Sequence, residues 1–100
     1  MKLTITLGNG GTQTIEAKKF SHYIGGVRYW FAYHKSLTTI ETVITHVESG
    51  VRVTSIPHMT LAASYGDTKH AAKMTLDELV ARVGAPRVRS ALDAAAKLAN

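Results

Sequence analysis

Aromatic and basic side chains are concentrated in one segment near the end of the first third of the chain. Residues 28–35 read Arg-Tyr-Trp-Phe-Ala-Tyr-His-Lys and hold four of the seven aromatic residues. Aromatic residues on an alternating strand fill a core more often than they face solvent. We therefore expect Tyr29, Phe31 and Tyr33 in the core. Exposed rings beside cations can instead stack on bases and bind phosphates, so the candidate binding residues of this segment are Arg28, Trp30, His34 and Lys35.

The histidines are regularly spaced, at twelve-residue intervals, as His22, His34, His46, His58 and His70. Segments 22–34 and 46–58 both fit His-x3-Gly-Val-Arg-x5-His, a match that chance or an old hairpin duplication would explain. Metal motifs bring histidines within about five residues of one another. The spacing therefore predicts no metal site, and no motif predicts a cofactor.

Histidine with neighbouring arginine can serve a metal-free ribonuclease, in which histidine acts as acid and base and a cation stabilises the phosphate. His34 and His46 stand on expected strands, with Arg28 and Arg52 in similar positions. Any small basic domain carries such residues, and hydrolase, phosphate-loop and dinucleotide motifs are absent from the sequence. A ribonuclease is therefore an alternative, and the main expectation is a protein without catalytic residues.

The first half of the chain is expected to form a sheet. Alternating apolar residues and glycine-containing turns mark strands at 2–7, 12–17, 27–35, 42–47 and 51–56. The connections are too short for helical crossovers, so the strands are expected to be antiparallel. Residues 2–56 thus predict an antiparallel sheet of about five strands, with hairpin turns at 8–11 and 48–50.

The second half has helical periodicity. Thr75 and Glu78 fit a capping box, which predicts a helix over 75–83. Gly84 and Pro86 suit the end of that helix and the start of the next, over 86–99. The second helix has an apolar stripe of Val88, Ala91, Leu92, Ala95 and Leu98. We expect this pair to pack on one face of the sheet in an α+β domain, with a sixth strand at 59–63 and a short helix opening at Asp67.

The segment from Thr75 to Arg87 resembles the first helix and turn of a helix-turn-helix DNA reader. The resemblance covers about a quarter of the chain, and Ser90 and Asp93 stand where that family has apolar residues. It implies that Arg87 and Arg89 would meet phosphates near the start of the second helix. With Arg52, these two arginines complete the set of candidate binding residues.

Composition limits the class of protein. The chain has 100 residues, no cysteine and a net charge of +5, divided as +3 over residues 1–56 and +2 over residues 57–100. Disulfide scaffolds, thiolate zinc sites and cysteine nucleophiles are excluded. No segment fits a signal peptide or a membrane helix. We expect a single cytoplasmic domain over residues 1–100, with a mild attraction to acidic partners.

These observations favour a small basic binding module that acts on nucleic acid or on a protein complex that handles it. In size and composition the chain is similar to phage-encoded inhibitors of bacterial defence, such as the anti-CRISPR proteins. The first alternative is a DNA-binding regulator that uses the helical pair, and the second is the histidine-dependent ribonuclease. No membrane partner is expected, and an unpaired edge strand could make a homodimer.

Overall fold

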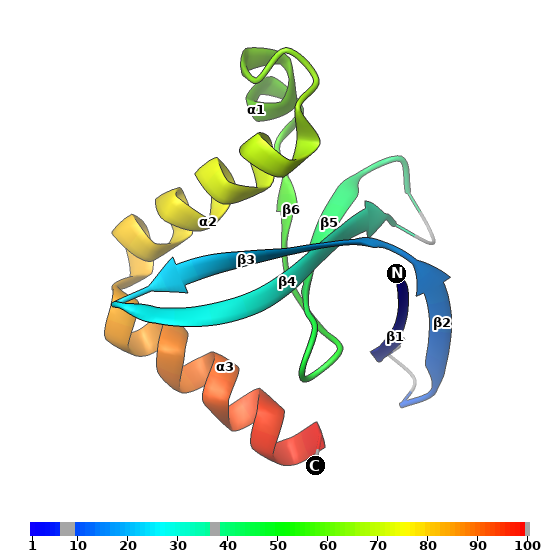
Figure 1. Ribbon diagram of the computed structural model, residues 1–100, viewed down its shortest axis with the longest axis vertical. Helices are drawn as coiled ribbons and strands as arrows, with labels where there is room; N and C mark the ends of the chain where they lie inside the picture. Colours follow the sequence, from blue (N-terminus) through cyan, green and yellow to red (C-terminus); the bar gives the residue numbers. More distant parts are fainter. Residues whose placement is uncertain (7–9, 37–38, 100) are drawn as a thin grey trace.

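The computed structural model describes residues 1–6, 10–36 and 39–99, and over these residues it contains six strands followed by three helices (Figure 1). All six strands are antiparallel, so the predicted α+β class is confirmed. The strands are β1 (Lys2–Thr6), β2 (Thr12–Glu16), β3 (Lys18–Ile24), β4 (Val27–Lys35), β5 (Thr42–His46) and β6 (Val51–Ile56).

The larger sheet has four strands in the order β3-β4-β5-β6. Strands β3 and β4 form a hairpin around Gly25 and Gly26, whose φ angles of 57° and 83° lie in the left-handed region that glycine adopts at low cost. The predicted set of five strands is wrong because it omits β3. This strand buries only Phe20 and Ile24 deeply, so its sequence lacks a continuous apolar alternation.

The smaller sheet pairs β1 with β2 and lies on the face of the larger sheet that the helices leave free. Leu3 and Ile5 of β1 pack with Ala17 and with Ala32 of β4 in a second apolar cluster. The chain therefore buries both faces of β4 at this point, because Ala32 is fully buried while Phe31 is buried on the opposite side. The predicted turn at 8–11 lies partly outside the described residues.

The helices are α1 (His58–Ala63), α2 (Thr68–Val83) and α3 (Ala85–Ala99). The predicted strand at 59–63 is wrong, since this segment forms α1. The helix predicted to open at Asp67 and the helix predicted over 75–83 are one continuous helix, in which the Asp67 carboxylate accepts the His70 backbone amide at 3.1 Å. The capping box is also wrong, because helical hydrogen bonding runs through Thr75, whose hydroxyl donates to the Ala71 carbonyl at 2.8 Å.

Helix α3 begins within one residue of the predicted start, with Gly84 as the only residue between it and α2. Val88 and Leu92 are buried as the stripe predicts. Ala91 and Leu98 are exposed, against expectation, Leu98 to 90%, and the buried residue of the last turns is Ala96. The buried side chains of α3 thus run from Val88 to Ala96, and the residues that follow are exposed.

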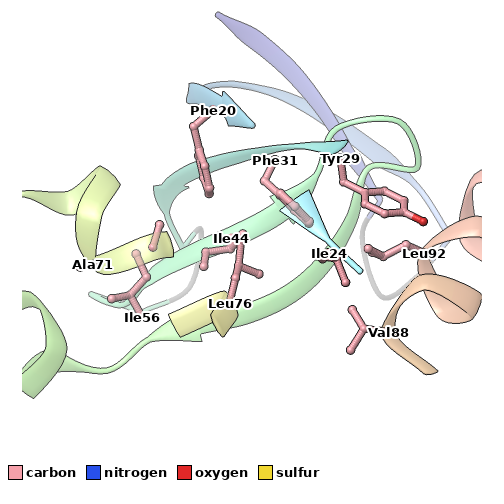
Figure 2. Packing of buried hydrophobic residues seen from close by; sticks show 11 residues of the cluster. Phe20, Ile24, Tyr29, Phe31, Ile44, Ile56, Ala71, Leu76, Val88 and Leu92 are labelled. Carbon is pink, nitrogen blue, oxygen red and sulfur yellow. The ribbon is translucent and has the colours of Figure 1, made fainter. Parts of the chain in front are cut away.

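The main core lies between the larger sheet and helices α2 and α3 (Figure 2). Phe20, Phe31 and Ile44 from the sheet pack with Leu76 of α2 and Leu92 of α3. This arrangement confirms that the C-terminal helices pack on one face of the sheet. In the described part of the chain, no helix is both long enough and apolar enough to cross a membrane.

Candidate functional site

The exposed end of the β3–β4 hairpin carries a cluster of basic and aromatic side chains on the face away from the helices. We call Lys19, Tyr23, Arg28 and Trp30 the Trp30 patch. Ser21 pairs with Trp30 and Tyr23 pairs with Arg28, and paired residues of an antiparallel ladder share one face. Lys19 and Tyr23 flank Ser21 at two-residue spacing, so all four members of the patch point the same way.

Two cations of the patch contact its indole ring. Lys19 Nζ lies 4.5 Å and Arg28 Cζ lies 4.9 Å from the Trp30 ring centroid, within the range of a cation–π interaction. Trp30 is 39% exposed. Among the described residues neither cation forms an ion pair with a carboxylate. Both positive charges are therefore held in place by the ring and remain available to an anion.

Tyr23 supplies a second aromatic group beside these cations. Its side chain is 64% exposed, and it stands diagonally across the hairpin from Trp30. Diagonal neighbours of this kind lie within reach of aromatic side chains. The patch therefore combines two cations with two aromatic rings that are exposed in part.

The extent of the small sheet determines which part of β4 is exposed. Leu3 and Ile5 cover Ala32, which is fully buried, whereas Trp30, two residues earlier on the same face of β4, is exposed. The β1–β2 hairpin thus covers the part of β4 beside β5 and leaves the part toward the Gly25 turn open (Figure 1). The limited length of the small sheet therefore leaves this surface accessible.

His34 and Lys35 lie apart from the patch, although they share its strand. His34 is 4 residues from Trp30, or about 13 Å along an extended strand. Its Nε2 lies 2.8 Å from the Thr45 hydroxyl and its Nδ1 lies 3.0 Å from the Lys35 carbonyl oxygen. Both residues line a cleft of about 270 Å³ that also contains Glu16. Lys18 and the N-terminal residue line the same cleft, so its lining is mostly basic, but it lies too far along the strand to be continuous with the Trp30 patch.

Arg52 is also outside the patch. It lies on the edge strand β6, and its guanidinium is 3.7 Å from the Glu41 carboxylate. Both side chains are about half exposed. This surface ion pair reduces the positive charge that Arg52 presents to a partner.

The two arginines of α3 have different surroundings. Arg87 is exposed, whereas Arg89 is partly buried and packs on the β3–β4 turn. A Cβ atom at Gly25 would lie 3.1 Å from Arg89 Cδ, so the arginine stem occupies the space that a side chain would need. The Arg89 Nε atom is buried without a hydrogen-bond partner. Arg89 thus anchors α3 to the turn and does not project from the helix toward a ligand.

The two candidate catalytic histidines are on opposite faces of the larger sheet. His46 packs at 5.9 Å from the Phe31 ring on the helical side, whereas His34 is paired with Val43 and points the other way. His46 Nδ1 lies 2.8 Å from the Ser49 hydroxyl. Burial lowers the pKa of His46, and the nearby Glu48 and Asp93 carboxylates oppose this shift only in part. The two imidazoles therefore do not form one acid–base pair.

Comparison with protein-family models, curated proteins and solved structures finds no match for this chain. Of the predicted binding residues, the structure brings Arg28 and Trp30 together and separates the others from them. Lys19 and Tyr23 were not predicted, because their proximity to Trp30 depends on the register of the unpredicted strand β3. The alternation Lys19-x-Ser21-x-Tyr23 is the signal in the sequence that could have identified them.

Proposed function

We propose that this protein binds single-stranded nucleic acid through the Trp30 patch. The observation that carries the proposal is the position of Lys19 and Arg28, at 4.5 and 4.9 Å from one partly exposed indole, with an exposed tyrosine beside them. Binding sites for single strands combine a basic surface that follows the backbone with aromatic rings on which bases stack. Both components are present on this open sheet face.

Each member of the patch has a distinct role in this proposal. Lys19 and Arg28 bind phosphates, because their charges are not paired with carboxylates among the described residues. Tyr23 stacks on a base, since its ring is largely exposed. Trp30 positions the two cations and offers the exposed part of its ring to a neighbouring base. An open sheet face suits splayed bases better than the grooves of a duplex.

Duplex recognition by the helical pair has less support. A helix-turn-helix joins its helices by a turn of about three to four residues, and here only Gly84 separates α2 from α3. Arg89, one of the two expected phosphate contacts, is partly buried against Gly25. The expectation of a nucleic-acid-handling protein as partner stays a prediction.

The test is an anisotropy titration of a fluorescently labelled oligothymidylate and of a mixed-sequence RNA, repeated at several salt concentrations. We expect binding that weakens with salt, with the slope reduced by about 0.7 for each of Lys19→Ala and Arg28→Ala. Removal of a stacking ring in Tyr23→Ala should weaken binding by about 1–3 kcal/mol at all salt concentrations.

Arg82→Ala is the matched control, because Arg82 is an exposed cation of α2 outside the patch. It should leave both the affinity and the salt slope close to those of the parent chain. The proposal fails if the parent chain does not bind either oligonucleotide at low salt. It also fails if the patch variants bind as tightly as Arg82→Ala.

A further inference from the structure

An apolar groove lies on the helical side of the larger sheet, on the face opposite the Trp30 patch. Its volume is about 260 Å³. The start of β6, the second half of α2 and the first turns of α3 form its walls, and His46 and Ser49 also line it. We call this cavity the α3 groove. The groove is open to solvent along one side, so a ligand could enter it without opening the fold.

The walls of the α3 groove are aliphatic. Val88, Ala91, Leu92 and Ala95 follow the spacing of one helical face and give the groove its long wall. Val83 of α2, opposite them, is 38% exposed although it is apolar. The folded chain therefore leaves branched side chains in contact with water here, and an apolar ligand would remove that contact.

The charged side chains of the groove are both arginines. Arg87 lies at the start of α3, is exposed, and forms no ion pair or hydrogen bond within the described residues. Arg52 lies on the β6 side, where Glu41 partly neutralises it. Among the described residues that line the groove there is no carboxylate. Glu48 and Asp93 act on His46 at the inner part of the groove, so an anionic group would be accepted at the other end, by the unpaired Arg87.

The polar pair in the groove uses most of its hydrogen-bonding groups internally, and His46 Nε2 is the atom of the pair without a partner among the described residues. His46 and Ser49 contact each other at 2.8 Å, and the Ser49 hydroxyl also accepts the Val51 backbone amide at 3.2 Å. This pair offers few free hydrogen-bonding groups, so the inner part of the groove suits an alkyl chain. The anionic end of a ligand would instead face Arg87.

We infer that the α3 groove binds a small amphipathic carboxylate, with its alkyl chain along α3 and its carboxylate on Arg87. The wall from Arg87 to Ala95 spans nine residues, or about 12 Å of helix. An extended medium-chain acyl group matches this length. The inference is independent of nucleic-acid binding, because the groove and the Trp30 patch are on opposite faces of the sheet.

The experiment is a titration of the isotope-labelled protein with octanoate, followed by amide chemical shifts. Saturable shifts should concentrate in α3, in the second half of α2 and at the start of β6. Acetate, which lacks the chain, should cause no such shifts, and 1-octanol, which lacks the charge, should bind more weakly. Arg87→Ala should weaken octanoate binding about tenfold, the loss expected for a hydrogen bond to a charged group.

A pair of alanine variants on α3 separates groove binding from weak surface adsorption. Ala91→Phe fills the groove and should abolish the saturable shifts, whereas Ala94→Phe places the same ring on an exposed position that does not line it. Both positions are exposed, so the fold should persist in each. Equal octanoate binding by the two variants would overturn the inference. Equal affinity for 1-octanol and octanoate would overturn the assignment of a carboxylate.

Discussion

Tyr29 and Trp30 are adjacent in β4 and have opposite surroundings. Tyr29 is 8% exposed and donates a hydrogen bond from its hydroxyl to the Asp93 carboxylate at 3.0 Å, whereas Trp30 is on the open face. Strand alternation was enough to predict this difference from the sequence. The contacts of Trp30 with Lys19 could not be predicted in the same way, because they depend on pairing with another strand.

His46 should make the stability of the fold depend on pH. Burial lowers its pKa in the folded protein, so the unfolded chain takes up a proton first as pH falls below about 6.5. Stability should therefore be greatest above that value and should decline as pH falls toward the lowered pKa of the folded protein. Urea midpoints measured between about pH 8 and about pH 5.5 test this direction.

Replacement of His46 isolates its share of the pH dependence. His46→Gln keeps a polar group beside Ser49 but cannot titrate, so its urea midpoint should fall less between the two pH values than that of the parent chain. His58→Gln is the control, since His58 is exposed at the start of α1. If His46→Gln and the parent chain lose stability equally, burial of this imidazole is not the cause.

At the scale of elements, the boundaries of α2 show what local patterns can and cannot decide. The Thr75–Glu78 pattern is typical of a helix start, yet the helix begins seven residues earlier at Thr68. Ala71 and Ala72 are completely buried, so the apolar face of α2 extends toward its N-terminus beyond the expected start. The sequence has a possible N-cap at Asp67 and another at Thr75. Burial of Ala71 and Ala72 favours the start at Asp67, and this tertiary contact cannot be read from the local pattern.

Asp67 should contribute measurably to stability as the N-cap of α2. Asp67→Ala removes the acceptor of the His70 amide and should lower the free energy of unfolding by about 1 kcal/mol. Asp67→Asn keeps an acceptor of similar capping preference and should stay close to the parent chain. Urea denaturation followed by far-ultraviolet circular dichroism measures both. Equal losses in the two variants would contradict the capping role.

At the scale of the whole molecule, β4 joins two apolar clusters, one on each face of the larger sheet. Phe31 belongs to the cluster under the helices, and Ala32 belongs to the cluster under the β1–β2 hairpin. The spacing of apolar residues in the second half of the chain predicted the layer of helices on one face of the sheet. The sequence did not predict that the first two strands form a separate sheet. The alternation of apolar and polar residues in a strand is the same whether the strand joins the larger sheet or pairs in a sheet of its own.

Because the two clusters share β4, the molecule should unfold as one unit. Leu3 is 4% exposed, and Leu3→Ala should lower the free energy of unfolding by about 2–5 kcal/mol while a single transition is kept. Leu98→Ala, at a position that is 90% exposed, should change stability little. A separate early loss of amide protection in β1 and β2, with an unchanged main transition, would contradict this coupling.

The partial cover provided by the β1–β2 hairpin also has an optical consequence. The chain has one tryptophan, and it is 39% exposed on the open face, whereas the main core contains only tyrosine and phenylalanine rings. Indole emission from the native chain therefore comes entirely from the surface proposed to meet a ligand. A base bound at the patch would quench this emission, so no added label would be needed. A ligand bound on the helical side would leave the emission wavelength and intensity nearly unchanged.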